Sequence, residues 1–222
     1  IKDFSGLENL EEIQGYFAIN HMAGLKTFVG LNNLRIINQG LGFVVLDSIQ
    51  SLNGLEEIDT IGNGIFLMAN PALKNLHGIE NVISFNGDIV ISLNENLTDI
   101  SDLSDFNSYH VDSLIIKNNP LLSDCNINMI CELININPEK ANIYENAVGC
   151  SSNVDIEEMC NYLGCFPDGI HFYSQQDIDN FLIENPNCTK IEGSVYINDT
   201  TDGNIKNLDG LSNINSIGSY VY

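Results

Sequence analysis

Side chains that could catalyse a reaction or hold a metal ion are widely scattered in this sequence of 222 residues. None of the four histidines has a second histidine or cysteine two to four residues further on; they are His21, His77, His110 and His171. Such short spacings are typical of metal sites. His77 takes the turn position that Asp209 holds in a later repeat, so we expect it at the surface. The sequence predicts no metal site.

An enzyme that cleaves glycans would need a pair of carboxylates on one face. Only Asp88 and Asp112 are expected near the face of a predicted sheet, both at strand starts, and neither recurs at the same position of a neighbouring repeat. Glycine-rich phosphate loops and serine-nucleophile motifs are absent from the sequence. We therefore predict no catalytic residue, no cofactor and no enzymatic activity.

Residues 198–204 (NDTTDGN) offer several oxygen ligands for a calcium ion. They lack the spacing of a known calcium loop and its bidentate glutamate, so we interpret them as a polar turn. Three N-glycosylation sequons begin at Asn96, Asn187 and Asn198 and have meaning only if the source is eukaryotic.

The net charge of −22 results from eight Lys and Arg against thirty Asp and Glu. This supply cannot build a basic patch, so nucleic acid is excluded as a partner and an anionic membrane surface would repel the chain. No apolar stretch approaches the length of a membrane span. The chain starts and stops inside a repeat, and we expect it to be a piece of a longer protein.

Six cysteines all follow the first 124 residues, and none forms a C-x-x-C pair. An even number of cysteines predicts disulfides and an oxidising compartment, hence an extracellular or cell-surface location. Three pairings are possible among the first four, and we favour first with third and second with fourth; these four are Cys125, Cys131, Cys150 and Cys160.

Apolar residues recur at steps of 24 along the chain, and a period of this length is typical of leucine-rich-type solenoids. One series is Leu7, Leu31, Leu55, Ile79 and Leu103; another is Phe4, Phe28, Leu52, Leu76 and Ile100. We predict a mostly β member of the α/β class, a right-handed β-helix or leucine-rich-repeat-like solenoid with turns of about 24 residues and disulfide-bonded helical caps. Asn70, Asn94 and Asn119 are expected at its corners, where they would satisfy backbone groups.

A short alternating run in each repeat predicts a strand that pairs in parallel with the next, about 4.8 Å away. The inward side chains would be Phe17 and Ile19, Phe43 and Val45, Phe66 and Met68, Ile89 and Ile91, and Leu114 and Ile116. The outward side chains would form an apolar stripe of Ala18, Val44, Leu67, Val90 and Ile115. The stripe has two explanations: β-propensity or cover by another part of the protein, and a docking face.

Residues 125–160 are expected to form a terminal cap, with a helix around 128–135, a strand around 142–144 and a helical turn near 156–159. A second domain begins near Cys165 with a strand at 170–173. Ser174 then provides an N-cap, with Asp177 three residues on, for an amphipathic helix. The 24-residue repeat resumes in "NLDGLSNINSIGSY".

The order of a cysteine, a short strand, a helix with "QQ" and then "NCTKIEGSVYI" resembles the N-terminal cap of the receptor L domain of the insulin- and EGF-receptor families. The "GL..L..I.G.I.I..N..L" repeats look like the repeats of that domain. The resemblance implies a first L-like domain over residues 1–160 that lacks its N-terminal cap, and the start of a second over residues 161–222. It also implies a disulfide between Cys165 and Cys188.

One departure from the family limits the resemblance. The receptors separate their two L domains by a long cysteine-rich region, whereas Cys160 and Cys165 lie close together here. The chain looks more like bacterial or other secreted proteins with tandem L-like domains, and hormone binding is not carried over. We expect a non-catalytic extracellular binding module that recognises a protein or glycan through its strand face. The alternative is a structural spacer or adhesin segment of a larger surface protein without a specific ligand.

Overall fold

The computed structural model describes residues 1–160, 164–166, 168–185, 188–198 and 204–222. The chain divides into two compact units, Ile1–Glu157 and Glu158–Tyr222. Both consist mainly of parallel strands with few helices.

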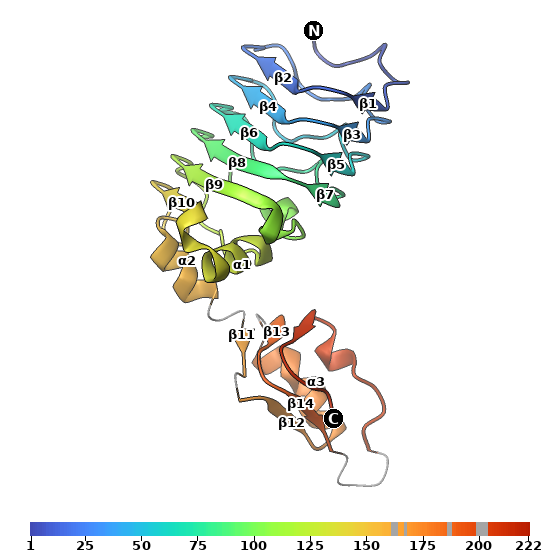
Figure 1. The fold of residues 1–222 in the computed structure, drawn as a ribbon, viewed down its shortest axis with the longest axis vertical. Coiled ribbons are helices and arrows are strands. Elements are labelled where there is room, and N and C mark those ends of the chain that lie inside the picture. The colour runs from blue at the N-terminus through green and yellow to red at the C-terminus, as the bar shows by residue number, and fades with distance from the viewer. Residues whose placement is uncertain (161–163, 167, 186–187, 199–203) are drawn as a thin grey trace. The chain divides into compact units, whose positions relative to one another are not determined.

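Unit 1 is built on two parallel sheets that run side by side (Figure 1). The larger sheet has six strands in the order β10-β9-β8-β6-β4-β2. Its strands, in chain order, are β2 (Phe17–Asn20), β4 (Leu41–Val44), β6 (Ile65–Met68), β8 (Gly87–Ser92), β9 (Val111–Lys117) and β10 (Ala141–Tyr144). The smaller sheet contains β1 (Glu12–Ile13), β3 (Ile36–Ile37), β5 (Thr60–Ile61) and β7 (Ser84–Phe85).

The register of both sheets follows the 24-residue repeat of the sequence. Phe17 pairs with Leu41, Leu41 with Ile65, and Ile65 with Ile89. The step lengthens to 25 between β8 and β9, where Gly87 pairs with Val111 but Asp88 pairs with Ser113. Each repeat is therefore one unit of the stack, and the parallel pairing predicted from the sequence is confirmed.

The core of unit 1 consists of columns of equivalent apolar side chains. The predicted leucine series is buried from its second member onward, at Leu31, Leu55, Ile79 and Leu103, whereas Leu7 in the first repeat is 46% exposed. Phenylalanines fill the first repeats, and the rings of Phe28 and Phe43 stack with centroids 4.6 Å apart. Each repeat buries its apolar face only against its neighbours, because one repeat alone has too little apolar surface.

Buried asparagines connect successive repeats at the corner after the long strands. The Asn94 amide nitrogen Nδ2 donates to the Leu67 carbonyl, and its Oδ1 accepts the backbone N–H of Asn70. Asn70, Asn119 and Asn146 make the same two kinds of bond one repeat away. The role predicted for the corner asparagines is thus confirmed, and each satisfies backbone groups that the turn would otherwise strand.

Helical segments and disulfides close unit 1. The 3-10 helices η1 (Ser101–Leu103) and η2 (Ser108–His110) precede β9, and α1 (Asn128–Ile136), η3 (Pro138–Lys140) and α2 (Asn153–Cys160) flank β10. The first predicted helix and the strand of the cap are confirmed, and the second helix begins earlier than predicted. Cys125 bonds Cys150, as favoured from the sequence, and Cys131 and Cys160 are also disulfide-bonded.

Unit 2 packs one helix against short parallel strands. Its elements are β11 (Gly164–Cys165), β12 (Ile170–Phe172), α3 (Gln175–Glu184), β13 (Lys190–Ile191), β14 (Val195–Ile197), η4 (Asp209–Leu211) and β15 (Ser216–Ile217). Ser174 and Asp177 form the predicted capping box of α3. Ile178 and Phe181 of α3 join Phe172, Ile191 and Val195 in the core. The implied disulfide between Cys165 and Cys188 is present.

Candidate functional site

The outward face of the six-stranded sheet carries a column of mostly apolar residues. The pairing register places Ala18, Gly42, Phe66, Val90 and Ile115 side by side, one on each of five strands. Ala18 is exposed, and the four others are half-buried. Val44 and Met68 lie in the next column, which continues with Ser92, a completely buried residue, and with Lys117. We call these two columns the strand face.

The structure corrects the predicted stripe in its third repeat. Leu67 is completely buried, so its prediction as an outward residue is wrong. Phe66 and Met68 point outward in its place, and Ile65 is the second inward residue of β6. Val44 is outward but lies one column away from Ala18, Val90 and Ile115.

The error arose because all four residues of β6, Ile-Phe-Leu-Met, are apolar, so a period of two has no unique phase. The 24-residue step contains the missing signal, since it leads from Phe43 to Leu67 and then to Ile91. Val45 was also predicted inward. It instead follows β4 with a φ of 56°, outside the strand.

A row of left-handed residues marks the corner where the long strands end. Val45, Ala69, Leu93, Asn118 and Glu145 all have φ between 54° and 60°. This region is uncommon for residues other than glycine, and a β-branched valine there is an outlier. The backbone bonds between repeats continue through the corner, since Val45 N–H donates to Met68 O and Ala69 N–H to Ser92 O.

A groove of about 620 Å³ follows this corner. We call it the corner groove. One wall is the left-handed row from Val45 to Glu145, and the other consists of Asp47, Pro71, Glu95 and Pro120. The buried asparagines lie between the two walls in sequence and point inward. No lysine, arginine or histidine lines the groove. The corner groove therefore combines an apolar lining with three carboxylates, those of Asp47, Glu95 and Glu145.

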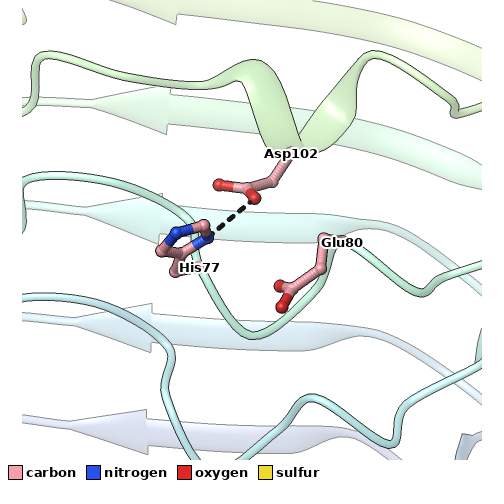
Figure 2. Close-up of side chains that lie close together, drawn as sticks. All are labelled: His77, Glu80 and Asp102. Atoms are coloured by element: carbon pink, nitrogen blue, oxygen red, sulfur yellow. Dashed lines mark hydrogen bonds and ion pairs between the residues drawn. The ribbon is translucent and has the colours of Figure 1, made fainter.

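A second feature of unit 1 is a cluster of His77, Glu80 and Asp102, shown in Figure 2. His77 Nδ1 lies 3.0 Å from Asp102 Oδ1, and one ligand atom from each of the three residues lies within 4.8 Å of the others. The His77 side chain is 65% exposed, as predicted, whereas the Asp102 side chain is 6% exposed. The structure thus brings together a histidine and two carboxylates that the sequence analysis did not group, although Glu80 is only three residues from His77.

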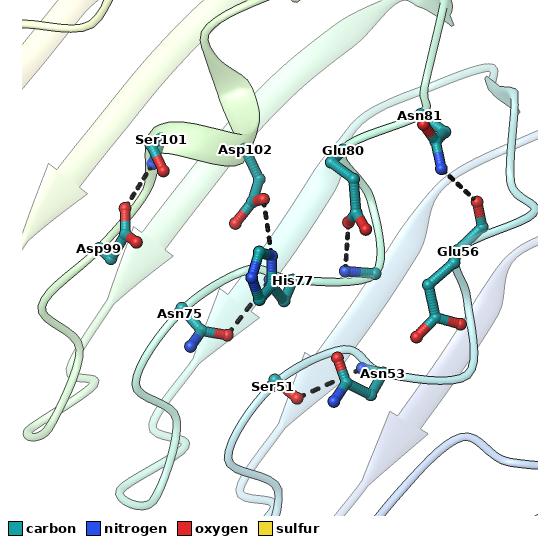
Figure 3. Close-up of polar contacts among 11 residues, drawn as sticks. Ser51, Asn53, Glu56, Asn75, His77, Glu80, Asn81, Asp99, Ser101 and Asp102 are labelled. Carbon is teal, nitrogen blue, oxygen red and sulfur yellow. Dashed lines mark hydrogen bonds and ion pairs between the residues drawn. The ribbon is translucent and has the colours of Figure 1, made fainter.

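Comparison of neighbouring repeats explains most of this cluster (Figure 3). Glu80 accepts the backbone N–H of Gly78, just as Glu56 accepts that of Gly54. His77 stands where Asn53 stands one repeat earlier, and Asp102 stands where the earlier repeats have Gly54 and Gly78. Gly78 has a φ of 120°, and a Cβ there would lie 2.1 Å from Leu52 O. Asp102 escapes that clash because its repeat forms η1 instead of the turn.

The electrostatics of the pair follow from its burial. The hydrogen bond and the negative charge of Asp102 raise the pKa of His77 above 6.5. Burial raises the pKa of Asp102, and the bond from His77 only partly offsets this effect. Asp102 Oδ2 is buried without a hydrogen-bond partner. Because Glu80 accepts the Gly78 N–H within its own turn, we interpret the cluster as an ion pair between His77 and Asp102 beside a structural carboxylate.

The other predicted chemical residues remain apart from these surfaces. His21 occupies the left-handed corner position of the first repeat, and His110 ends η2. Asp88 lies in β8 and Asp112 in β9, where Asp112 is the additional residue of the register shift. Asn96 is exposed and donates its amide to Pro71 O, and Asn198 is exposed at the end of β14. Asn187 and residues 199–203 lie outside the described residues, so the interpretation of residues 198–204 stays a prediction.

An aromatic column in unit 2 was not anticipated. His171 stacks on Tyr196 with centroids 4.3 Å apart, and Tyr196 stacks on Tyr222 at 4.9 Å. The register of β12 and β14 places the first two side by side. A step of 25 or 26 residues between aromatic positions was the available signal. The outward column is thus aromatic in unit 2 and mostly aliphatic in unit 1.

Among the described residues, no helix is both long enough and apolar enough to cross a bilayer. Comparisons of the chain with protein-family models, with curated proteins and with solved structures gave no significant match.

Proposed function

We propose that the protein is a non-catalytic binding module of the extracellular space or cell surface, which holds a partner on the strand face and the adjoining corner groove. The repeats would form a right-handed solenoid similar to a β-helix or a leucine-rich repeat. Residues 1–160 would be one receptor L-like domain and residues 161–222 the start of another. The disulfides support an oxidising compartment, since cytosolic thiols are kept reduced.

One observation carries the proposed function. Phe66, Val90 and Ile115 lie in one outward column, beside Val44 and Met68, and these five partly exposed side chains are all apolar. Contiguous apolar surface on an outward face is typical of interaction sites. It borders the corner groove directly, because Val45, Ala69 and Leu93 follow the ends of β4, β6 and β8. A partner could therefore contact both surfaces at once.

The test uses a displayed peptide library and a glycan array, probed with the wild type and two double variants. Phe66→Lys with Val90→Lys places two charges on the strand face. Ile83→Lys with Val148→Lys is the matched control, because these side chains are 87% and 90% exposed and lie in neither surface. The two variants change the net charge equally.

We expect the wild type and the control to retain the same ligands and the strand-face variant to lose them, with circular dichroism spectra that show both variants to be folded. Ligands that survive in the strand-face variant would contradict the proposed surface. A wild type that retains no ligand on either library would instead support a spacer.

A further inference from the structure

We propose that the corner groove binds a cationic peptide in the polyproline II conformation, with a lysine or arginine at every third residue. This inference rests on the proposed function and names the chemistry of its partner.

The charge of the groove selects a cationic ligand. Asp47, Glu95 and Glu145 are exposed carboxylates in its walls, and its lining has no positive group. Glu145 accepts a hydrogen bond from the Asn118 amide. The nearest basic neighbour in sequence, Lys117, has its ammonium 5.6 Å from the centroid of the Tyr144 ring. Carboxylates on both walls would therefore meet the side chains of a bound cationic chain.

The spacing of the carboxylates selects the backbone conformation. The wall residues alternate along the stack as Asp47, Pro71, Glu95 and Pro120, so acidic positions recur every second repeat. Repeats joined by backbone hydrogen bonds lie about 4.8 Å apart, which puts Asp47 and Glu95 roughly 9.6 Å apart. A polyproline II helix has three residues per turn and a rise of about 3.1 Å, so equivalent side chains recur every ~9.3 Å.

An extended β-strand does not fit the same spacing. Its side chains return to one face every second residue, about 6.7 Å apart, and the third residue points to the opposite side. The side-chain repeat of polyproline II differs from the spacing of Asp47 and Glu95 by roughly 0.3 Å. The side-chain repeat of a strand differs from that spacing by about 3 Å.

The apolar lining suits the remaining surface of such a ligand. Val45, Ala69 and Leu93 form one wall, and Leu93 is 50% exposed. Pro71 and Pro120 stand between the acidic positions of the other wall. Proline rings and the aliphatic stems of lysine or arginine would pack there. A proline-rich ligand is already ordered before it binds, so little conformational entropy is lost.

The experiment measures fluorescence anisotropy with two labelled peptides of equal composition. The in-step peptide repeats Arg-Pro-Ala four times, and the out-of-step peptide repeats Arg-Arg-Pro-Pro-Ala-Ala twice. The protein is tested as wild type, as Asp47→Asn with Glu95→Gln, and as Asp105→Asn with Glu57→Gln. The last variant is the control: both variants remove one Asp and one Glu charge, and Asp105 and Glu57 are exposed outside the groove.

We expect the wild type and the control to bind the in-step peptide at least about fivefold more tightly than the out-of-step peptide, as for two partly exposed ion pairs. The groove variant should lose that preference and about the same factor of affinity. A variant in which lysine replaces Asp47 and Glu95 should bind a peptide that repeats Glu-Pro-Ala more tightly than it binds the in-step peptide. Equal binding of both peptides by the wild type, or equal losses in both neutralised variants, would overturn the inference, since net charge alone would then explain the attraction.

Failure of this inference can be told apart from failure of the proposed function. Library ligands that need Phe66 and Val90, together with no preference for the in-step peptide, would leave the strand-face module standing and overturn the peptide assignment. An in-step preference that depends on Asp47 and Glu95, without any ligand that needs Phe66 and Val90, would support the groove and reject the strand face.

Discussion

The buried asparagines show how single residues hold the repeats of unit 1 in register. Asn94 is completely buried; its side chain pairs with backbone groups of Leu67 and Asn70 in the preceding repeat, and its own backbone N–H donates to Asn119 Oδ1 in the next. The sequence predicted this role at Asn70, Asn94 and Asn119, because an asparagine recurs after each strand. The same role of Asn146 in the cap was not predicted, because Asn146 follows Asn119 by 27 residues and not by 24. Asn146 likewise bonds backbone groups of the preceding repeat.

Replacement of Asn94 by alanine should lower the free energy of unfolding by roughly 2–5 kcal/mol, since the Asn70 N–H and the Leu67 carbonyl would be buried without partners. Asn96→Ala, two residues away and exposed, should cost less than about 1 kcal/mol. Urea denaturation of both variants measures the difference, and equal midpoints would refute the structural role of Asn94.

The ion pair of His77 and Asp102 makes the stability of the fold depend on pH, and its contribution falls as the pH rises. The pKa of His77 is raised in the folded state, so its stabilising bond is fully present below the unfolded pKa of 6.5 and is lost as the pH rises through the folded value. Burial raises the pKa of Asp102 above 3.8, so the carboxyl is harder to ionise in the folded state. Its ionisation therefore also lowers the free energy of unfolding as the pH rises.

Titration of the His77 Cε1 proton by NMR should therefore give a pKa above 6.5 in the wild type and a value closer to 6.5 in Asp102→Asn. The stability advantage of the wild type over this variant should shrink as the pH rises above 6.5. An unchanged His77 titration would show that the pair does not form.

At the scale of the strand, the repeat gave a more reliable prediction than local alternation. Strands with a polar or small outward residue, such as β2 with Ala18, were phased correctly from the sequence alone. β6 was not, because its uniformly apolar residues fit both phases. The 24-residue step from the inward Phe43 leads to Leu67 and decides between it and Phe66.

Two neighbouring lysine substitutions on β6 test that phase. Leu67→Lys should destabilise the fold by roughly 3 kcal/mol or more, since it places a charge in the core. Phe66→Lys should cost no more than about 1 kcal/mol, because its side chain faces outward. Thermal unfolding monitored by circular dichroism separates the two, and a larger loss for Phe66→Lys would reverse the register.

At the scale of the molecule, the repeats, the cap elements and the parallel pairing could be predicted, since each leaves a local or periodic mark in the sequence. The corner groove could not. Its walls combine residues that follow each strand by one and by three positions, such as Leu93 and Glu95, and their left-handed backbone has no signature in a valine or an alanine. The cluster of His77 and Asp102 depends likewise on a contact across 25 residues.

The disulfides should stabilise their own units. Loss of the bond between Cys125 and Cys150, by substitution of both with alanine, should cost unit 1 about 3.5 kcal/mol in the chain-entropy model for this loop length. The corresponding change at Cys165 and Cys188 should destabilise unit 2. Hydrogen exchange followed by mass spectrometry reads both units in one sample. Equal loss of protection in both units from either substitution would show that they unfold together.

The constant 24-residue register from β2 to β8 makes these repeats of unit 1 interchangeable. Ile49 and Leu73 are both buried at equivalent positions, so excision of residues 49–72 would put Leu73 where Ile49 stood and join β4 to β8 without a mismatch. Duplication or deletion of one such repeat would change the length of unit 1 and keep the same packing between neighbouring repeats. The strand face and the corner groove would then lengthen or shorten by one strand at a time.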